Sequence, residues 1–301
     1  MDPVPLTFQA PIADWGWMIA WFFWFIAIGG MLSVAYVRVR RAAVAVTILV
    51  TVAIGLALVF FHLGRWWNMP LVVWTMITEG RFNFGSWMFL GVLILTAHLA
   101  LAAVMTLAHA EALLRRLPWL GLVRALASST VVLGLFAAVG LLAVVYSGFL
   151  LTQASGIPLW GTPLIPVLWV ISSAVAAVAA LELMAVAGVV EEEVSVSGLT
   201  LGLGLDALKL LAVLAFLYVS LGVGSAAARL GAREMVSGSL AWMTWGGVVA
   251  AGILVPMALG AWMMLRGRNR ALLALSSVSA LAGVLFLRAA VLLAGAWEPL
   301  A

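Results

Sequence analysis

The sequence contains eight long runs of apolar residues, and these runs constrain the fold more than any other feature. A helix needs about 20 apolar residues to cross the hydrocarbon of a bilayer. The runs lie at approximately residues 17–37, 42–61, 85–107, 126–151, 163–190, 201–221, 240–265 and 272–294. The intervals between them are too short for a soluble domain. The sequence therefore predicts an all-α integral membrane protein with eight transmembrane helices in a single membrane domain, residues 1–301.

Composition agrees with this class and excludes several others. Hydrophobic residues make up 66% of the chain and charged residues 9%, whereas soluble domains carry roughly 25% charged residues. The sequence has no cysteine, which excludes disulfides and iron–sulfur clusters held by this chain. Its few arginines lie in connectors without a basic-aromatic cluster, so no nucleic-acid partner is expected. We expect a multi-pass protein of the inner (cytoplasmic) membrane.

Arginines mark the side of the membrane on which each connector lies. Positively charged residues concentrate on the cytoplasmic side of membrane proteins. The first, third and seventh connectors contain Arg38, Arg40, Arg41, Arg115, Arg116, Arg124, Arg266, Arg268 and Arg270. No basic residue precedes the first run, so it is expected to remain as a span rather than be cleaved as a signal peptide. Both termini and the even-numbered connectors are therefore predicted to lie outside.

Two connectors on the predicted outer side combine aromatic and polar residues. Residues 60–87 read FFHLGRWWNMPLVVWTMITEGRFNFGSW, and residues 146–166 read YSGFLLTQASGIPLWGTPLIP. The tryptophans could form an ordinary interfacial belt. That interpretation does not explain why His62, Arg65 and Asn68 lie in the same short stretch. Glycines and prolines in the second connector predict a fixed, non-helical crossing.

Ionisable residues inside spans are costly and are therefore candidates for function. At 1.5 Å per residue, Arg288 lies about 24 Å along the last span, near the outer side together with His62 and Tyr146. Phenol, imidazole and guanidinium groups beside aromatic side chains would suit a quinone head group. Histidine could also accept the protons of quinol. As alternatives, Tyr146 could be an interfacial tyrosine and Arg65 could bind lipid phosphate.

A second polar layer is predicted near the inner side. Asp206 and Lys209 are spaced i, i+3 and could simply neutralise each other. Alternatively, Glu182 and Asp206 could form a proton pathway from the inside. His98 could extend this pathway or merely bond a neighbouring helix. The histidines do not support haem, because His62 is outer, His98 central and His109 inner, so no pair lies at equal depth. We expect neither haem nor metal in this chain.

These motifs resemble the NrfD/PsrC family, the integral membrane subunits of polysulfide-reductase-type complexes. The resemblance covers all eight spans. It lies in WGWMIAWFFWFIAIGG from Trp15, HLGR at 62–65, RFNFGSW at 81–87, the connector from Tyr146, and LRAAVLLAG at 287–295. Some relatives have polar side chains early in the first helix, where this chain has Met18 and Trp21.

The resemblance implies a membrane anchor that binds menaquinone or a related quinone near its outer face. A four-cluster iron–sulfur subunit would dock there and pass electrons to or from a molybdopterin catalytic subunit, without haem in the anchor. It implies that Tyr146, Arg288, His62 and Arg65 contribute to the quinone site. Asp14 could replace the missing polar contacts of the first helix, and the neighbouring Trp15 is included in the predicted site.

The sequence thus predicts a quinone-reactive membrane subunit of a multi-subunit molybdopterin oxidoreductase. Coupled proton transfer and homodimerisation of the complex are left open. Two other functions remain as alternatives. The chain could be a secondary transporter, although no internal repeat is evident and its charges lie toward the two faces rather than at the midplane. It could also be a structural anchor that binds no quinone.

Overall fold

The computed structural model describes residues 13, 15–80, 82–117, 121–190 and 193–298. Eight helices within these ranges are long and apolar enough to cross a membrane. They are α1 (Trp17–Tyr36), α2 (Ala42–His62), α4 (Trp87–Leu107), α7 (Thr130–Thr152), α8 (Leu164–Val186), the segment Leu199–Gly222 of α9 (Glu193–Gly222), the continuous pair η3 (Trp242–Leu254) and α11 (Val255–Arg266), and α12 (Arg270–Leu293). The predicted fold class is confirmed.

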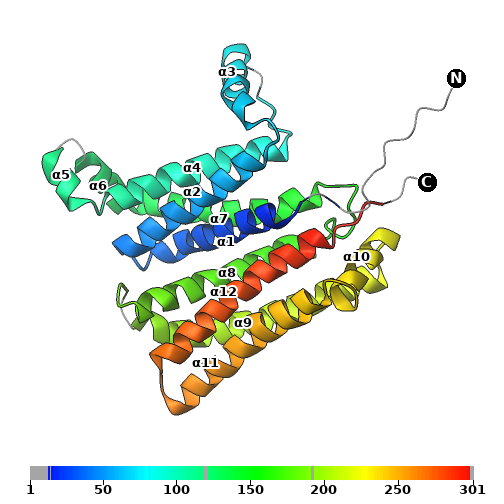
Figure 1. The fold of residues 1–301 in the computed structure, drawn as a ribbon. Coiled ribbons are helices and arrows are strands. Elements are labelled where there is room, and N and C mark those ends of the chain that lie inside the picture. Colours follow the sequence, from blue (N-terminus) through cyan, green and yellow to red (C-terminus); the bar gives the residue numbers. More distant parts are fainter. Residues whose placement is uncertain (1–12, 14, 81, 118–120, 191–192, 299–301) are drawn as a thin grey trace.

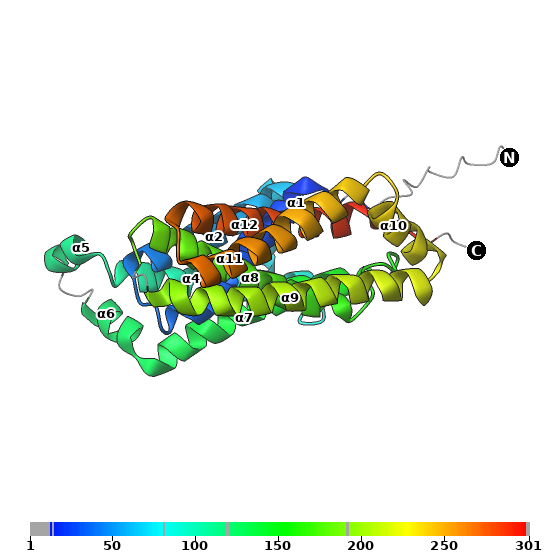
Figure 2. The same cartoon turned by 90° about the horizontal axis from the view of Figure 1, so that it is seen from below.

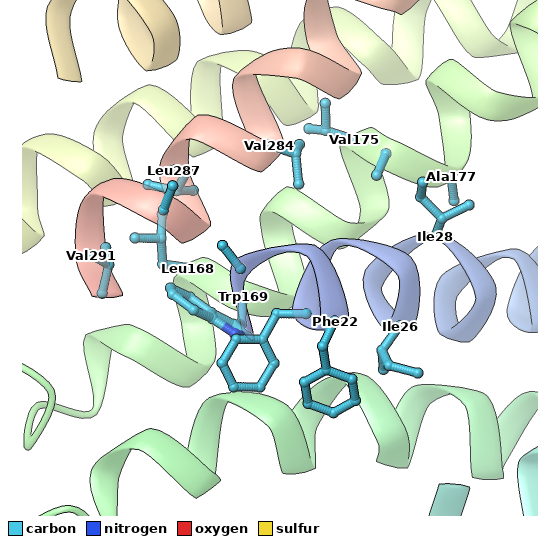
Figure 3. Close-up of a cluster of buried hydrophobic side chains, with 14 of the residues drawn as sticks. Phe22, Ile26, Ile28, Leu168, Trp169, Val175, Ala177, Val284, Leu287 and Val291 are labelled. Atoms are coloured by element: carbon cyan, nitrogen blue, oxygen red, sulfur yellow. The ribbon is translucent and has the colours of Figure 1, made fainter. Parts of the chain in front are cut away.

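The spanning helices form two adjacent four-helix bundles (Figure 1). The first bundle contains α1, α2, α4 and α7, and the second contains α8, α9, η3–α11 and α12. The bundles meet where α1 packs against α8 and α12, and where α7 packs against α8. Figure 3 shows this shared core, in which Trp169 and Leu168 of α8 lie beside Phe22 of α1 and Leu287 of α12.

Short helices lie at the two ends of the bundles. They are η1 (Trp66–Asn68), α3 (Met69–Glu79), α5 (Glu111–Arg116), α6 (Gly121–Ser128) and α10 (Ala226–Val236). Figures 1 and 2 show α5 and α6 at one end and α10 at the other. Because the spans alternate in direction, the two aromatic connectors lie at the same end, with α3 and α10. That this end faces outward remains a prediction from the arginine pattern.

Glycine pairs bring two pairs of helices into backbone contact. A Cβ atom added at Gly30 of α1 would lie 2.7 Å from the Gly140 carbonyl oxygen of α7. In the second bundle, a Cβ atom at Gly283 of α12 would collide with the Cα atom of Gly252 in η3. Small residues allow such close approach, and dispersion contacts between backbones then replace the hydrophobic effect that is missing in lipid.

The seventh span contains a break that other helices repair. Its first half is a π-helix, and Pro256 follows it in the first turn of α11. Proline has no N–H, so the preceding turn, which includes Ala251 and Gly252, lacks the one backbone donor that another residue at 256 would supply. Ser279 Oγ donates to Ala251 O at 2.5 Å, and Lys209 Nζ donates to Gly252 O at 2.6 Å. Side chains of α12 and α9 thus satisfy carbonyls that lipid could not.

Replacing Gly283 with alanine should destabilise the second bundle, because the added methyl group has no space beside Gly252. Overpacking of this kind costs about 1–3 kcal/mol. We expect a lower midpoint of thermal unfolding in detergent for Gly283→Ala. Gly246→Ala is the matched control, since Gly246 belongs to the same π-helix and a Cβ atom there would meet nothing within 4 Å. Equal midpoints for the two variants would contradict this packing.

Candidate functional site

The connector between α7 and α8 is fixed to both ends of the described chain. Trp160 is fully buried, and its Nε1 donates to Val291 O of α12 at 2.9 Å. The ring of Trp15, just before α1, lies 5.4 Å from that of Trp160. The Ala13 N–H donates to Gly295 O at 2.9 Å. This connector, which was predicted to cross without a helix, consists of turns and holds together the ends of α1, α8 and α12 that are predicted to face outward.

The other aromatic connector is far more exposed. Helix α3 stands away from the bundles in Figure 1. Trp66, Trp67 and Trp74 have exposed fractions of 41%, 59% and 66%. His62 ends α2, and both His62 and Arg65 are exposed. These residues therefore present an aromatic and basic surface at the end of the first bundle rather than a packed cover over it.

Arg288 is the centre of a buried group of hydrogen-bond donors. It is fully buried on α12, and its Nη2 donates to Trp169 O at 3.1 Å and to Ser173 Oγ at 3.0 Å. Its guanidinium carbon lies 3.9 Å from the centroid of the Trp169 ring. Within the described part of the chain, Arg288 Nε, Arg288 Nη1 and Trp169 Nε1 have no hydrogen-bond partner. Three buried donors therefore lie close together without an acceptor.

Sequence reasoning identified Arg288 by its depth but missed Trp169. Trp169 is fully buried and its ring faces Phe23 of α1 at 6.1 Å. The missed signal was its position: a tryptophan five residues inside the fifth span lies about 8 Å from the span's outer end, the same depth as Arg288 in the last span. A buried tryptophan usually has a partner for its N–H.

Tyr146 lies at a similar depth but faces another helix. It is 5% exposed on α7, and its hydroxyl occupies the space that a Cβ atom at Gly91 of α4 would need. Tyr146 thus points into the first bundle, whereas Arg288 contacts α8 of the second. Asp14 lies outside the described residues. The structure therefore divides the predicted outer site between two bundles, and the roles of its residues stay predictions.

The structure brings Glu182 and Asp206 to the same cavity. This cavity of about 30 Å³ lies between α8, α9, α11 and α12, and both carboxylates line it. That volume is enough for at least one water molecule. Ser277 Oγ of α12 donates to Glu182 Oε2 at 2.7 Å. The two acids are buried, and a solvated position between them is available.

A second cavity lies next to this one at the predicted inner end. It has a volume of about 180 Å³ and is lined by Ala185 and Val186 of α8 and by Arg268, Asn269 and Arg270 before and within the start of α12. Ala185 is less than one helical turn beyond Glu182. The larger cavity therefore brings the basic connector between α11 and α12 close to the buried acid.

Lys209 has a structural position between these acids and the broken helix. Its Nζ lies 3.1 Å from Asp206 Oδ1 and donates to Gly252 O. Both charged side chains are almost completely buried. The ion pair expected from their i, i+3 spacing is thus present, and it also places a donor at Gly252 O, in the turn before Pro256.

His98 does not join the acids of the second bundle. It is fully buried on α4, and its Nε2 lies 2.7 Å from Ser33 Oγ of α1. Its ring centroid is 5.8 Å from that of Phe136 on α7. His98 therefore belongs to the interior of the first bundle, whereas Glu182 and Asp206 belong to the second. Among the described residues, no group of three or more histidine or acidic side chains could hold a metal ion.

The chain is similar to known proteins over nearly its full length. The family model described as Polysulphide reductase, NrfD, matches residues 5–298. The protein named Protein NrfD from Escherichia coli (strain K12) is 30% identical over 311 aligned positions, which cover 93% of this chain and 94% of that protein. The similarity thus includes all eight spanning helices and both aromatic connectors.

Replacing Lys209 alone should destabilise the protein more than replacing Lys209 together with Asp206. Lys209→Met leaves Asp206 buried without a counter-charge, which typically costs about 3–5 kcal/mol. In the double variant Lys209→Met, Asp206→Asn that unpaired charge is gone. We expect a large fall in the thermal unfolding midpoint for the single variant and a smaller one for the double variant. Additive effects of the two substitutions would show that the ion pair does not couple them.

Proposed function

The chain belongs to the NrfD family and is a multi-pass membrane subunit of a redox complex; from this premise we propose that it binds a quinone and exchanges electrons with an iron–sulfur subunit. The quinone is menaquinone or a related compound, bound near the predicted outer end. The iron–sulfur subunit docks at that end and connects the quinone to a molybdopterin catalytic subunit. The complex lies in the inner membrane.

The group of free donors around Arg288 carries this proposal. Buried polar groups in proteins almost always have a hydrogen-bond partner, so three donors without one indicate a missing acceptor. A quinone head group offers carbonyl oxygens, which accept hydrogen bonds, and its flat ring suits aromatic neighbours such as Trp169 and Phe23. Arginine and tryptophan cannot accept hydrogen bonds, so the partner must be an acceptor. The residues present therefore fit a quinone.

Other residues would complete the site, at the depth of Arg288 or nearer the aqueous phase. Tyr146 would supply a phenol from the first bundle, and His62 at the end of α2 would accept or release protons near the aqueous phase. Trp15, whose ring contacts Trp160 of the connector between α7 and α8, would line the site, and Asp14 would contribute a carboxylate. Arg65, exposed after α2, would contact the quinone from the aqueous side. A quinone supplies two-electron redox chemistry when bound, and these side chains would orient it and hold its protons.

The exposed aromatic connector would be the docking surface of the iron–sulfur subunit. Tryptophan and arginine are enriched where proteins associate, and Trp66, Trp67 and Trp74 are all exposed at one end of the first bundle. Electron transfer needs a short path, so a cluster at this end would be close to a quinone in the outer third of the helices. The same tryptophans would lie in the membrane interface if no partner covered them.

The acids of the second bundle would hold protons near the inner side. Glu182 and Asp206 share a cavity large enough for water, and the 180 Å³ cavity beside Ala185 gives an approach from the inner end. Protonatable groups arranged in this way are typical of proton pathways in membrane proteins. We propose that they take part in proton movement coupled to quinone turnover, with Lys209 setting the charge state of Asp206.

The proposed role of the donors on Arg288 and Trp169 is tested by measuring the affinity for quinone. Trp169→Phe keeps the ring and removes one N–H, which corresponds to about 1 kcal/mol or roughly fivefold weaker quinone binding. Arg288→Gln should weaken binding at least tenfold, because hydrogen bonds from a charged group contribute about 1.5–3 kcal/mol. Both effects are measured as copurified quinone and as the Kd of a quinone analogue. Trp262→Phe, an exposed tryptophan of α11, is the control. Unchanged quinone content in both variants would favour an anchor without quinone chemistry.

The proposed role of Glu182 and Asp206 in proton movement is tested by counting the protons moved per quinone converted. In the double variant Glu182→Gln, Asp206→Asn, we expect fewer protons moved across the membrane per quinone converted, because neither side chain can be ionised. The ratio is measured with the complex in vesicles that contain a pH-sensitive dye. Glu234→Gln, which removes a half-buried carboxylate of α10 outside the spanning helices, is the matched control. A ratio equal to that of the unaltered complex would exclude these acids from the pathway.

A further inference from the structure

The interior of the first bundle contains protonatable side chains at three depths. Tyr146 lies nearest the predicted outer end, with its hydroxyl against Gly91 of α4. His98 lies seven positions further along the same buried face of α4, two helical turns or about 10 Å inward. Nearest the inner end, the Tyr36 hydroxyl of α1 lies 2.8 Å from Nε2 of His109, just beyond α4. These groups lie in order along one bundle.

The hydrogen bond of His98 leaves one ring nitrogen free to accept a proton. Ser33 Oγ lies 2.9 Å from Gly29 O and 2.7 Å from His98 Nε2; when its proton goes to Gly29 O, the same oxygen accepts from His98 Nε2. The neutral ring then carries its lone pair on Nδ1. Among the residues that the structure describes, this fully buried Nδ1 has no hydrogen-bond partner. His98 can therefore accept a proton on an atom that no neighbouring side chain occupies.

The inner pair lies at the edge of the membrane. His109 is partly buried, and burial together with the positive charge of Arg124 lowers its pKa from the ordinary value. A neutral His109 at physiological pH can take up a proton from water. Arg40 faces Tyr36 from the first connector, and Arg124 faces His109 from α6. No buried acid is found in the described part of this bundle, so nothing there would trap the proton as an ion pair.

Two apolar side chains separate the three depths. Phe136 is fully buried, with its ring 5.7 Å from that of Tyr36 and 5.8 Å from that of His98. Leu95 is buried on α4 between Gly91 and His98. A proton needs a continuous series of polar groups or waters, so it can pass these two positions only when water enters them. A closed resting state of this kind would prevent passive leakage across the membrane.

We propose that the first bundle is a proton pathway between the inner aqueous phase and Tyr146, formed by His109, Tyr36 and His98 and closed at rest by Phe136 and Leu95. This inference rests on the proposed function, because it supplies the protons that a quinone beside Tyr146 takes up or releases. It is separate from the acids of the second bundle, which share no hydrogen bond with His98 in the described residues. Its ligand is the proton itself, carried by side chains and transient water.

The test uses the complete complex in vesicles that expose the α5–α6 side to a pH-sensitive dye. His98→Gln keeps an amide for the bond to Ser33 but cannot be protonated. We expect at least a tenfold loss of quinone-linked turnover and of the pH change on that side. Tyr36→Phe, which removes only a hydroxyl, should slow both several-fold. Thr106→Val is the control, since it removes only the hydroxyl of Thr106, which donates to Ala102 O of the same helix at 2.8 Å, and leaves the Thr106 carbonyl in place.

The outcomes separate this pathway from the quinone site. Full turnover and a full pH change in both His98→Gln and Tyr36→Phe would overturn the pathway, while lost turnover in Tyr146→Phe would still support the quinone site. Full turnover in Tyr146→Phe would instead contradict the role of Tyr146 in the proposed function. Equal recovery of partner subunits with every variant shows that assembly is intact. A loss of turnover in Thr106→Val as large as in His98→Gln would mean general damage to the helix and would count against the pathway.

Discussion

Hydrocarbon offers no partners to polar groups, so every charge that this chain buries must be met by another group of the chain. The second bundle shows how this requirement links distant helices. Pro256 removes one backbone donor from the seventh span, Lys209 of α9 donates to Gly252 O in the preceding turn, and Asp206 balances the charge of Lys209. Glu182 is met by Ser277 of α12. Arg288 is met only in part, and its unpaired donors are the clearest indication of a bound acceptor.

The sequence was sufficient for those features that depend on one helix at a time. Eight apolar runs predicted the eight spanning helices, because length and hydropathy are properties of each segment alone. The i, i+3 spacing predicted the pairing of Asp206 with Lys209, since both lie on the same helix face. Glycines and prolines after α7 predicted the non-helical connector, although not that Trp160 would fix it to α12. The broken seventh span was not predicted, because its repair depends on donors from other helices.

Features that depend on how helices face one another could not be predicted from the position of a residue along its span. Position along each span placed Tyr146 and Arg288 in the same outer layer, and the structure agrees with that depth. Depth says nothing of rotation about the helix axis, and the two side chains contact α4 and α8. For the same reason the sequence could not decide whether His98 extends the pathway of the acids or bonds a neighbouring helix, and its partner Ser33 lies on α1. Trp169 was missed because an isolated tryptophan in an apolar run looks like ordinary core.

The two bundles differ in the kind of polar group that they bury. All four buried charged side chains of the described residues, Glu182, Asp206, Lys209 and Arg288, lie in the second bundle. In the described part of the first bundle, the buried polar side chains include no acid, lysine or arginine; among them are Tyr36, Ser33, His98 and Tyr146. Fixed charges can bind an acceptor or hold a proton, whereas neutral groups can pass a proton on without leaving an ion pair behind. This division favours binding at the seam between the bundles and proton transfer within the first.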